Sequence, residues 1–314
     1  MTTTTESAPR GAAIDGADAL ALGERVAATY ALAPPQRLEA TTGGRLGRRP
    51  GSSLEFQEFR EYQPGDDLRH VDWGVYARSD QLVVRRFREE IQPHLDLVLD
   101  GSRSMTTPSA KLDGALALAA FLAGTAVAGA FTYRLWWGDD GGRLVADDDR
   151  PRDWRLPQPK GRSGLGAPLD RLAGRFRRRG LRVVLSDFLF DDDPGARVAR
   201  WGRGSAALVL IQVLAAEERH PEPGGFVRLE DSETGERLDL LLDGATVAGY
   251  RRALDRHQSA WRAACQAQGA LWIGIEAEGM LSAWKGGDDG SSRAAVEPVS
   301  TLLRHGLLEP RGRS

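Results

Sequence analysis

The sequence predicts an α/β protein with a doubly wound, mostly parallel sheet and an extended N-terminal arm that contains some β structure. Apolar segments of strand length alternate with longer helical segments from residue 95 onward. Several strand segments, such as residues 206–211, are continuously apolar, which is typical of strands covered on both faces. Alternating strands and helices favour parallel strands joined by crossover helices.

The expected elements follow in order along the chain. Residues 18–31 are expected to form a helix that ends before Pro34 and Pro35, and residues 82–87 a strand. From the first core strand we expect a strand at 95–100, a helix at 109–128, a strand at 131–137, a short strand at 143–146, a helix at 167–178, a strand at 181–186, a helix at 194–202, a strand at 206–213, a hairpin near 226–241, a helix at 243–267 and a strand at 270–275.

Charge and glycine placement set some of these boundaries. The arginines at 177–179 complement a helix dipole and Gly180 suits the following position, so the helix from 167 is expected to end at 178. Residues 115–131 carry no charge for 17 positions, but they are mostly Ala and Gly and lead into a strand with Arg134. We expect a helix buried against the sheet here and no membrane insertion.

Four regions are expected from these patterns. Residues 1–40 form a disordered tail with a possible helix, 41–92 an N-terminal arm, 93–280 the α/β domain and 281–314 a C-terminal tail. Residues 41–53 hold many Gly, Pro and Arg, which indicates a linker or extended arm. Residues 54–88 crowd aromatic side chains with both signs of charge around the turn signal Pro64-Gly65-Asp66.

Composition excludes several functional classes. The formal net charge of −2 gives no reason to expect nucleic acid as a partner. The single Cys265 excludes an internal disulfide framework and a cysteine-based zinc site, and fits a reducing, cytoplasmic setting. Residues 1–10 are polar and lack the apolar core of a signal peptide.

The chain is organised around residues 95–105, where a buried strand runs into Asp100-Gly-Ser102-Arg-Ser104. One carboxylate and two hydroxyls on a turn are hard oxygen ligands, which suit Mg²⁺ or Mn²⁺. A strand end followed by a serine helix cap would give the same string without any metal. Asp187 likewise ends the predicted strand at 181–186. If the strand order is the Rossmann-like 3-2-1-4-5-6, these two strands are neighbours where the order reverses, and both carboxylates meet in one crevice.

Two patterns in the sequence resemble those of known protein families. Asp100-x-Ser102-x-Ser104 resembles the first part of the metal-ion-dependent adhesion site of von Willebrand factor A domains, and Ser186-Asp187 resembles its third part. The string across residues 54–88 resembles the signature of the bacterial domain of unknown function 58 family. The resemblance implies a von Willebrand A-like domain that works beside a MoxR-type AAA+ ATPase in the assembly or activation of an unknown protein client. We expect the protein itself not to be an enzyme. The adhesion-site pattern normally adds a threonine, and Ser163 is the candidate to replace it.

The signature residues of the arm have two interpretations. They are Arg60, Tyr62, Asp66, Asp67, Arg69, Asp72, Trp73 and Arg78. The charged members can form an ion-pair network that braces the arm against the sheet, since Arg–carboxylate pairs are good structural clamps. Alternatively, Tyr62, Trp73 and Tyr76 anchor a partner.

Two other functions stay open. A Mg²⁺-dependent phosphohydrolase would use Asp100 and Asp187, although position 102 holds Ser where haloacid-dehalogenase-type phosphatases need a second carboxylate. A structural scaffold would keep a degenerate metal site. The chain lacks a Gly-x-Ser-x-Gly elbow and a Walker A motif, which disfavours a serine hydrolase or an NTPase. The expectation is therefore a metal-dependent interaction protein with Asp100, Ser102, Ser104, Asp187 and Ser163 as ligands.

Overall fold

A six-stranded sheet forms the centre of the larger of two units in this computed structural model. The larger unit comprises Met1–Leu38 and Pro93–Ser314, and the smaller comprises Glu39–Gln92. The structure describes residues 16–35, 54–64, 66, 68, 71–89, 92–162, 164–232, 234–286 and 296–311. The strands of the sheet are β4 (His94–Asp100), β5 (Thr132–Gly138), β6 (Arg143–Asp147), β7 (Leu181–Ser186), β8 (Ala207–Leu214) and β11 (Leu271–Glu276).

The sheet is mixed but mostly parallel. Its order is β11-β8-β7-β4-β5-β6, and only the edge strand β6 runs antiparallel to its neighbour. Numbered along the chain, this is the order 3-2-1-4-5-6, so the condition for bringing Asp100 and Asp187 together is met. The order reverses between β4, which ends at Asp100, and β7, which ends one residue before Asp187.

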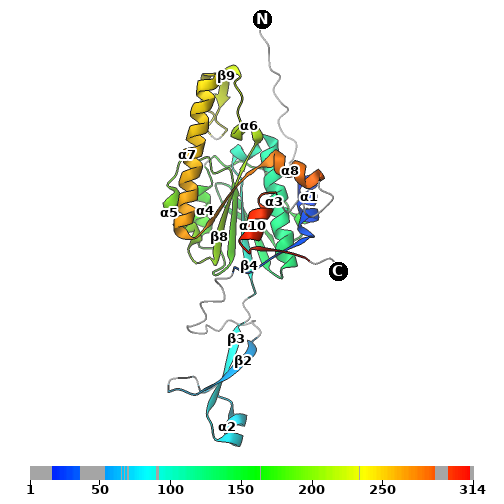
Figure 1. Cartoon of the computed structure of the whole chain (residues 1–314), viewed down its shortest axis with the longest axis vertical. Coiled ribbons are helices and arrows are strands. Elements are labelled where there is room, and N and C mark those ends of the chain that lie inside the picture. The colour runs from blue at the N-terminus through cyan, green and yellow to red at the C-terminus, as the bar shows by residue number, and fades with distance from the viewer. Residues whose placement is uncertain are drawn as a thin grey trace. The chain divides into compact units, whose positions relative to one another are not determined.

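Helices cover both faces of the sheet (Figure 1). They are α1 (Ala17–Ala27), α3 (Ser109–Ala128), α4 (Gly166–Leu172), α5 (Pro194–Gly202), α6 (Ala216–Arg219), α7 (Gly244–Gln268), α8 (Ala277–Gly286) and α10 (Val299–Arg304). One apolar core lies between the sheet and α1, α3, α8 and α10. The other lies between the sheet and α4, α5 and α7, and it contains stacked tryptophans. Packed helices therefore support both faces of the sheet, including the edge at which Asp100 and Asp187 lie.

The helix α3 has the bounds that the sequence predicts. It is the one described helix with the length and apolar composition to cross a membrane, and 78% of that apolar window is buried inside the structure. Gly114, in its second turn, lies so close to Ala277 that a Cβ would stand 2.9 Å from the Cβ of Ala277. The helix therefore packs tightly against its neighbours at this position.

The helix expected at 167–178 ends six residues early, at Leu172. The reason lies in the neighbouring strand, because the Arg177 N–H donates to Asp96 Oδ2 at 2.8 Å instead of to a helical carbonyl. Asp96 is fully buried and also accepts from Trp136 Nε1 at 2.9 Å. The chain therefore leaves the helix to satisfy a buried carboxylate.

The region expected to be a C-terminal tail adds structure to the larger unit. The helices α8 and α10 contribute Trp284, Val299 and Leu302 to the core. The last strand, β12 (Leu308–Pro310), pairs antiparallel with β1 (Tyr30–Leu32) near the N-terminal helix. Both strands have only three residues, so neither carries a recognisable alternation.

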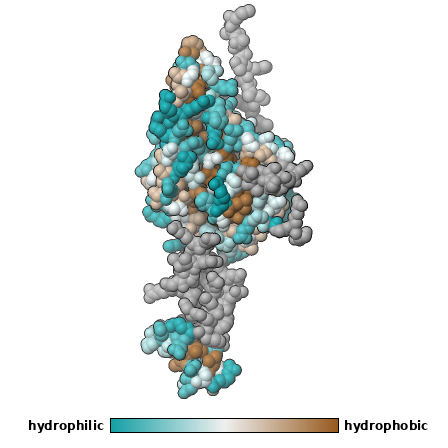
Figure 2. All heavy atoms as spheres, in the orientation of Figure 1, coloured by the Kyte–Doolittle hydropathy of each residue, from teal (hydrophilic) through white to brown (hydrophobic). Residues whose placement is uncertain are grey.

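A β-hairpin stands at the end of the larger unit that carries the carboxyl ends of the sheet strands (Figure 1). Its strands are β9 (Gly225–Glu230) and β10 (Arg237–Leu242), close to the expected hairpin at 226–241. Apolar side chains gather on this end (Figure 2). The exposed ones include Phe226, which is 89% exposed, and Leu238, which is 60% exposed.

The described part of the smaller unit consists of a two-stranded antiparallel ribbon and one short helix. Its elements are β2 (Leu54–Glu61), β3 (Val83–Glu89) and α2 (Trp73–Ser79). The strand expected at 82–87 is confirmed as β3, with bounds that differ by one or two residues. The helix α2 was not predicted. Asp72 caps this helix by accepting from the Gly74 and Val75 N–H groups at 2.9 and 3.1 Å.

Candidate functional site

The candidate site lies at the carboxyl ends of β4 and β7. Leu99 of β4 pairs with Leu185 of β7, so the next residues of the two strands, Asp100 and Ser186, lie side by side. The Ser186 hydroxyl donates to Asp100 Oδ2 at 2.5 Å. Asp187 follows directly and is almost fully buried. Parallel pairing therefore brings the two predicted carboxylates to one edge.

The turn after β4 gathers the two serine hydroxyls. The Ser102 N–H donates to Asp100 Oδ1 at 2.8 Å, which folds the turn back over its own carboxylate. Ser102 Oγ and Ser104 Oγ lie 3.0 Å apart. Ser102 is buried, whereas Ser104 is half-buried. Ser104 therefore lies on the more accessible side of the turn.

Gly101 is required by close packing beneath this turn. A Cβ at this position would lie 2.2 Å from Nε1 of the buried Trp137. The Gly101 carbonyl also accepts from the Lys160 and Gly161 N–H groups, both at 3.1 Å. The indole ring of Trp137 and the backbone of residues 160–161 thus hold the turn in place.

That second loop contains the predicted fifth ligand. Ser163 lies outside the described residues, so the structure does not test it. Its neighbour Gly161 forms a parallel bridge with Ser102 and accepts from the Arg103 N–H at 3.1 Å. The loop therefore reaches the Asp-x-Ser-x-Ser turn, as a loop that supplies a further ligand would need to do.

The charges around the site are unevenly balanced. Burial, together with the nearby Asp187 carboxylate, raises the pKa of Asp100 to about 7. In the described part of the chain, Asp100 has no Lys, Arg or His nitrogen within ion-pair distance. Asp187 does have such a partner, since its Oδ2 lies 3.1 Å from Lys111 Nζ. The acidic pair is therefore only half compensated by the protein itself.

Lys111 is a member of this site that the sequence analysis missed. It lies in the first turn of α3 and is only 1% exposed, and it also contacts Glu218 Oε1 at 2.6 Å. Burial lowers the pKa of Lys111, but the charges of Asp187 and Glu218 outweigh burial and raise the pKa above its ordinary value. The available signal was weak: Lys111 lies at the start of a long, mostly apolar helix, and a charge there must find a partner only if that turn is buried.

The protein oxygens fit a small hard cation. Bonds of about 2.0–2.1 Å in an octahedral Mg²⁺ shell place neighbouring ligand oxygens about 2.9 Å apart. The two serine hydroxyls have this spacing, and the Asp100 carboxylate lies in the same turn. Asp100, Ser102, Ser104 and Asp187 thus form a set of oxygen donors, which we call the edge site. Among the described residues, no group of three or more His, Cys, Asp or Glu side chains is placed to hold a metal ion, so hydroxyls would have to complete the shell.

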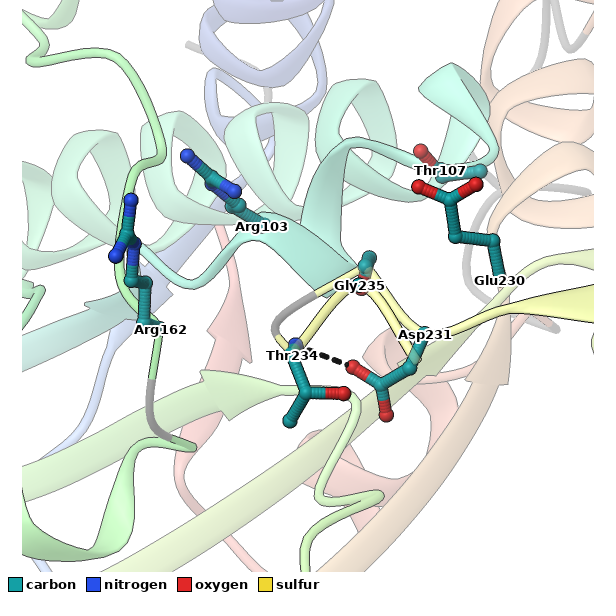
Figure 3. Close-up of a pocket in the computed structure, with 8 residues that line it drawn as sticks. Arg103, Thr107, Arg162, Glu230, Asp231, Thr234 and Gly235 are labelled. Atoms are coloured by element: carbon teal, nitrogen blue, oxygen red, sulfur yellow. Dashed lines mark hydrogen bonds between the residues drawn. The ribbon is translucent and has the colours of Figure 1, made fainter. Parts of the chain in front are cut away.

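A cavity of about 410 Å³ lies beside the edge site (Figure 3). Arg103, the residue between the two serines, and Arg162 line one side of it. The turn of the hairpin lines the other side, where Asp231 Oδ1 accepts from the Thr234 N–H at 2.8 Å. The hairpin therefore stands next to the loops that carry the edge site.

The arm residues do not join the edge site. Asp66 accepts from Arg60 Nη2 at 2.7 Å and from the Gln63 N–H at 2.8 Å, and these bonds hold the pKa of Asp66 below its usual value. Arg78 Nε donates to the Gly74 carbonyl at 2.9 Å within the same short helix. These contacts all lie within the arm. Asp67 and Arg69 lie outside the described residues.

The predicted aromatic anchors of the arm differ in exposure. Trp73 is 58% exposed and contacts Tyr76 edge to face, with ring centroids 6.1 Å apart. Tyr76 is also exposed, whereas Tyr62 is half-buried and its N–H donates to the Leu82 carbonyl at 2.9 Å. Among the described side chains of the arm, Trp73 and Tyr76 form an aromatic pair exposed to solvent.

Solved structures of two bacterial proteins are similar to this chain at low scores. An aerotolerance-related membrane protein from Bacteroides fragilis has 15% sequence identity and a TM-score of 0.33, over 62% of this chain and 96% of that one. A conserved hypothetical protein, BatB, from Bacteroides thetaiotaomicron has 11% identity and a TM-score of 0.30, over 68% of this chain and 99% of that one.

Comparisons of sequence give a higher identity over more of the chain. The uncharacterized proteins Mb1516 of Mycobacterium bovis and Rv1480 of Mycobacterium tuberculosis are each 31% identical over 254 residues, which cover 74% of this chain and 77% of theirs. The model of the family described as "Protein of unknown function DUF58" matches residues 58–260, well over half of the chain. The chain therefore belongs to the DUF58 family.

Proposed function

We propose that this protein is a non-enzymatic interaction module that captures a partner through a divalent cation held at the edge site. The observation that carries the proposal is the 3.0 Å spacing of the Ser102 and Ser104 hydroxyls beside the Asp100 carboxylate. A strand end with an ordinary serine cap would not require two hydroxyls that face each other. Mg²⁺ or Mn²⁺ is the cation that suits such oxygens.

Each residue of the edge site has a distinct role in this proposal. Ser102 and Ser104 would hold the cation directly through their hydroxyls, while Asp100 and Asp187 would supply the negative charge. A bound cation would accept a carboxylate of the partner as a further ligand. Ser104 lies on the more accessible side of the turn, which supports approach of a partner from there.

We propose that the partners are a MoxR-type AAA+ ATPase and a protein client, in a cytoplasmic setting. The family resemblance of the arm and the motif supports this choice. The exposed pair Trp73 and Tyr76 supports the arm as one docking face, because exposed aromatic side chains are frequent anchors of interfaces. No nucleic acid is proposed, since the net charge of the chain is −2.

One specific contact favours a second candidate, a scaffold with a degenerate metal site. The Lys111 ammonium already compensates Asp187, so the fold does not need a cation to tolerate this buried carboxylate. A phosphohydrolase is less well supported. Both oxygens of Asp100 accept hydrogen bonds from Ser102 and Ser186, and the side chain is fully buried, which is a poor arrangement for a nucleophile.

A titration with divalent cations separates the module from the scaffold. Thermal unfolding of the wild type, of Asp100→Asn and of Asp191→Asn would be followed with Mg²⁺ or Mn²⁺, and with Ca²⁺ for comparison. Asp191 is an exposed carboxylate in the loop after β7 and serves as the matched control. A cation at about 100 times its dissociation constant stabilises the native state by about 2.7 kcal/mol, which raises the midpoint by several degrees.

The proposal expects this rise for the wild type and Asp191→Asn, and its loss for Asp100→Asn. Equal shifts in all three proteins would mean that the cation binds elsewhere. The absence of any shift up to millimolar cation would favour the scaffold.

A further inference from the structure

Lys111 is a buried charge that contacts the edge site and that the proposed function does not use. Its Nζ lies 3.1 Å from Asp187 Oδ2 and 2.6 Å from Glu218 Oε1, and the side chain is 1% exposed. Among the oxygens of the edge site, only those of Asp187 have a cation of the protein this close in the described residues. Asp100 is held by neutral donors instead, the Ser102 N–H and the Ser186 hydroxyl.

The contact with Lys111 and the other hydrogen bonds of Asp187 leave its carboxylate little capacity to bind a metal ion. Its Oδ2 accepts from Lys111, and its Oδ1 accepts from the Leu189 N–H at 3.2 Å. Its backbone carbonyl accepts from Gln212 Nε2 at 2.8 Å, which fixes the main chain as well. A metal ion at the edge site must therefore share the charge of Asp187 with an ammonium group that cannot move away easily.

Glu218 keeps Lys111 in this position. Its second oxygen accepts from the Ala215 N–H at 2.9 Å, and its carbonyl accepts from the Tyr250 hydroxyl at 2.7 Å. The carboxylate is thus anchored on α6 and shares the ammonium with Asp187. It weakens the hold of Lys111 on Asp187 because the single positive charge is divided between two acids.

We propose that Lys111 is a built-in counter-cation that lowers the affinity of the edge site for a divalent metal ion, with Glu218 limiting this effect. The inference rests on the proposed function. Like charges repel strongly where little water intervenes, so a fixed ammonium beside a ligand carboxylate opposes an incoming cation. The protein then keeps its fold without metal, and the metal binds reversibly.

Two substitutions at this contact are expected to act in opposite directions. Glu218→Gln leaves the whole Lys111 charge on Asp187 and weakens binding of Mn²⁺. Lys111→Met in the Glu218→Gln background removes that charge without leaving Glu218 unpaired, and it strengthens binding of Mn²⁺ by at least about tenfold relative to Glu218→Gln. A merely structural role of Lys111 would not produce this gain, because a damaged site loses affinity.

The experiment is calorimetric titration of Mn²⁺ into the wild type, Glu218→Gln and Lys111→Met/Glu218→Gln. Far-ultraviolet circular dichroism checks that each protein is folded. Addition of Asp100→Asn to the double variant tests where the metal binds, and this change is expected to abolish the gain. Should the double variant not fold, Lys111→Arg keeps the positive charge and is expected to bind Mn²⁺ no more tightly than the wild type; tighter binding would overturn the inference.

The outcomes separate this inference from the proposed function. If the wild type binds Mn²⁺ and the double variant binds no more tightly than Glu218→Gln, Lys111 does not oppose the metal and the inference is wrong, while the module stands. If only the double variant binds, Lys111 blocks the site and the inference holds, while the proposed function of the wild type fails. If neither binds, both are wrong.

Discussion

Gly101 shows how strictly a single position supports the edge site. Its Cα lies against the indole of Trp137, so that an added methyl group would stand 2.2 Å from Nε1. Trp137 belongs to β5 and is fully buried in the apolar core, where close packing opposes its displacement. The position therefore requires glycine for reasons of packing, since its φ angle is not among the positive ones.

We predict that Gly101→Ala destabilises the protein by about 1–3 kcal/mol, because the new methyl group overpacks a closed core. The same change moves the Ser102 and Ser104 hydroxyls and removes the Mn²⁺-induced rise of the unfolding midpoint. Urea unfolding measures the first effect and thermal unfolding with Mn²⁺ the second. Gly141→Ala is the control, because its Cβ would make only an ordinary contact, 3.5 Å from Asp139 Oδ1. Equal stabilities of the two variants would contradict the packing argument.

Residue by residue, the sequence predicts the edge site from the ends of two strands. Asp100 and Asp187 could be placed together because parallel strands present their carboxyl ends on one edge. Lys111 could not be placed, because its contact with Glu218 spans 107 positions and a lysine near a helix end is ordinarily exposed. Strand geometry is thus enough to predict the two carboxylates. The contact of Lys111 depends on packing between elements far apart in the sequence, and it could not be predicted.

At the scale of elements, the C-terminal strand β12 contributes more to the stability of the fold than its length of three residues suggests. It pairs with β1, and it follows Leu307, whose carbonyl accepts from the Ala33 N–H at 3.0 Å. Leu307 and Leu308 are both buried. The two ends of the described chain therefore stabilise each other beside α3.

We predict that a chain ending at Gly306 loses about 3 kcal/mol or more of stability, since two buried leucines contribute about 1.5–3 kcal/mol each. The thermal midpoint then falls by several degrees. Differential scanning calorimetry of the truncated and full chains measures the loss. Glu309→Ala is the control, because this exposed side chain lies on the same strand and its removal leaves the pairing with Ala31 intact. A truncated chain as stable as the full one would show that the pairing contributes nothing.

The elements also show where pattern suffices and where it fails. The helix at 109–128 has the predicted bounds, because a run of 20 residues with few charges has no other way to bury itself. The helix from 166 ends early because the buried Asp96 takes the Arg177 N–H, a contact between residues 81 positions apart. The strands β1 and β12 are too short for a periodic signal, so only the folded structure reveals them.

At the scale of the molecule, the chain combines two units with different surfaces. The larger unit holds the edge site and its hairpin, and the smaller unit offers the exposed pair Trp73 and Tyr76. The arm contacts described for Arg60 and Asp66 lie within the smaller unit. A brace does not require an exposed aromatic pair, so Trp73 and Tyr76 are consistent with the proposed docking of a partner.

We predict that Trp73→Ala removes co-purification of a MoxR-type ATPase while the thermal midpoint stays within about a degree of the wild type, because an exposed side chain contributes little to the fold. Asp66→Ala differs, since it breaks the Arg60 ion pair and lowers the midpoint. Phe226→Ala removes an aromatic side chain of the larger unit that is even more exposed, 89% against 58% for Trp73, and it is expected to retain the ATPase. Capture that survives Trp73→Ala would return the arm to a structural role, and capture lost in Phe226→Ala alone would assign docking to the hairpin.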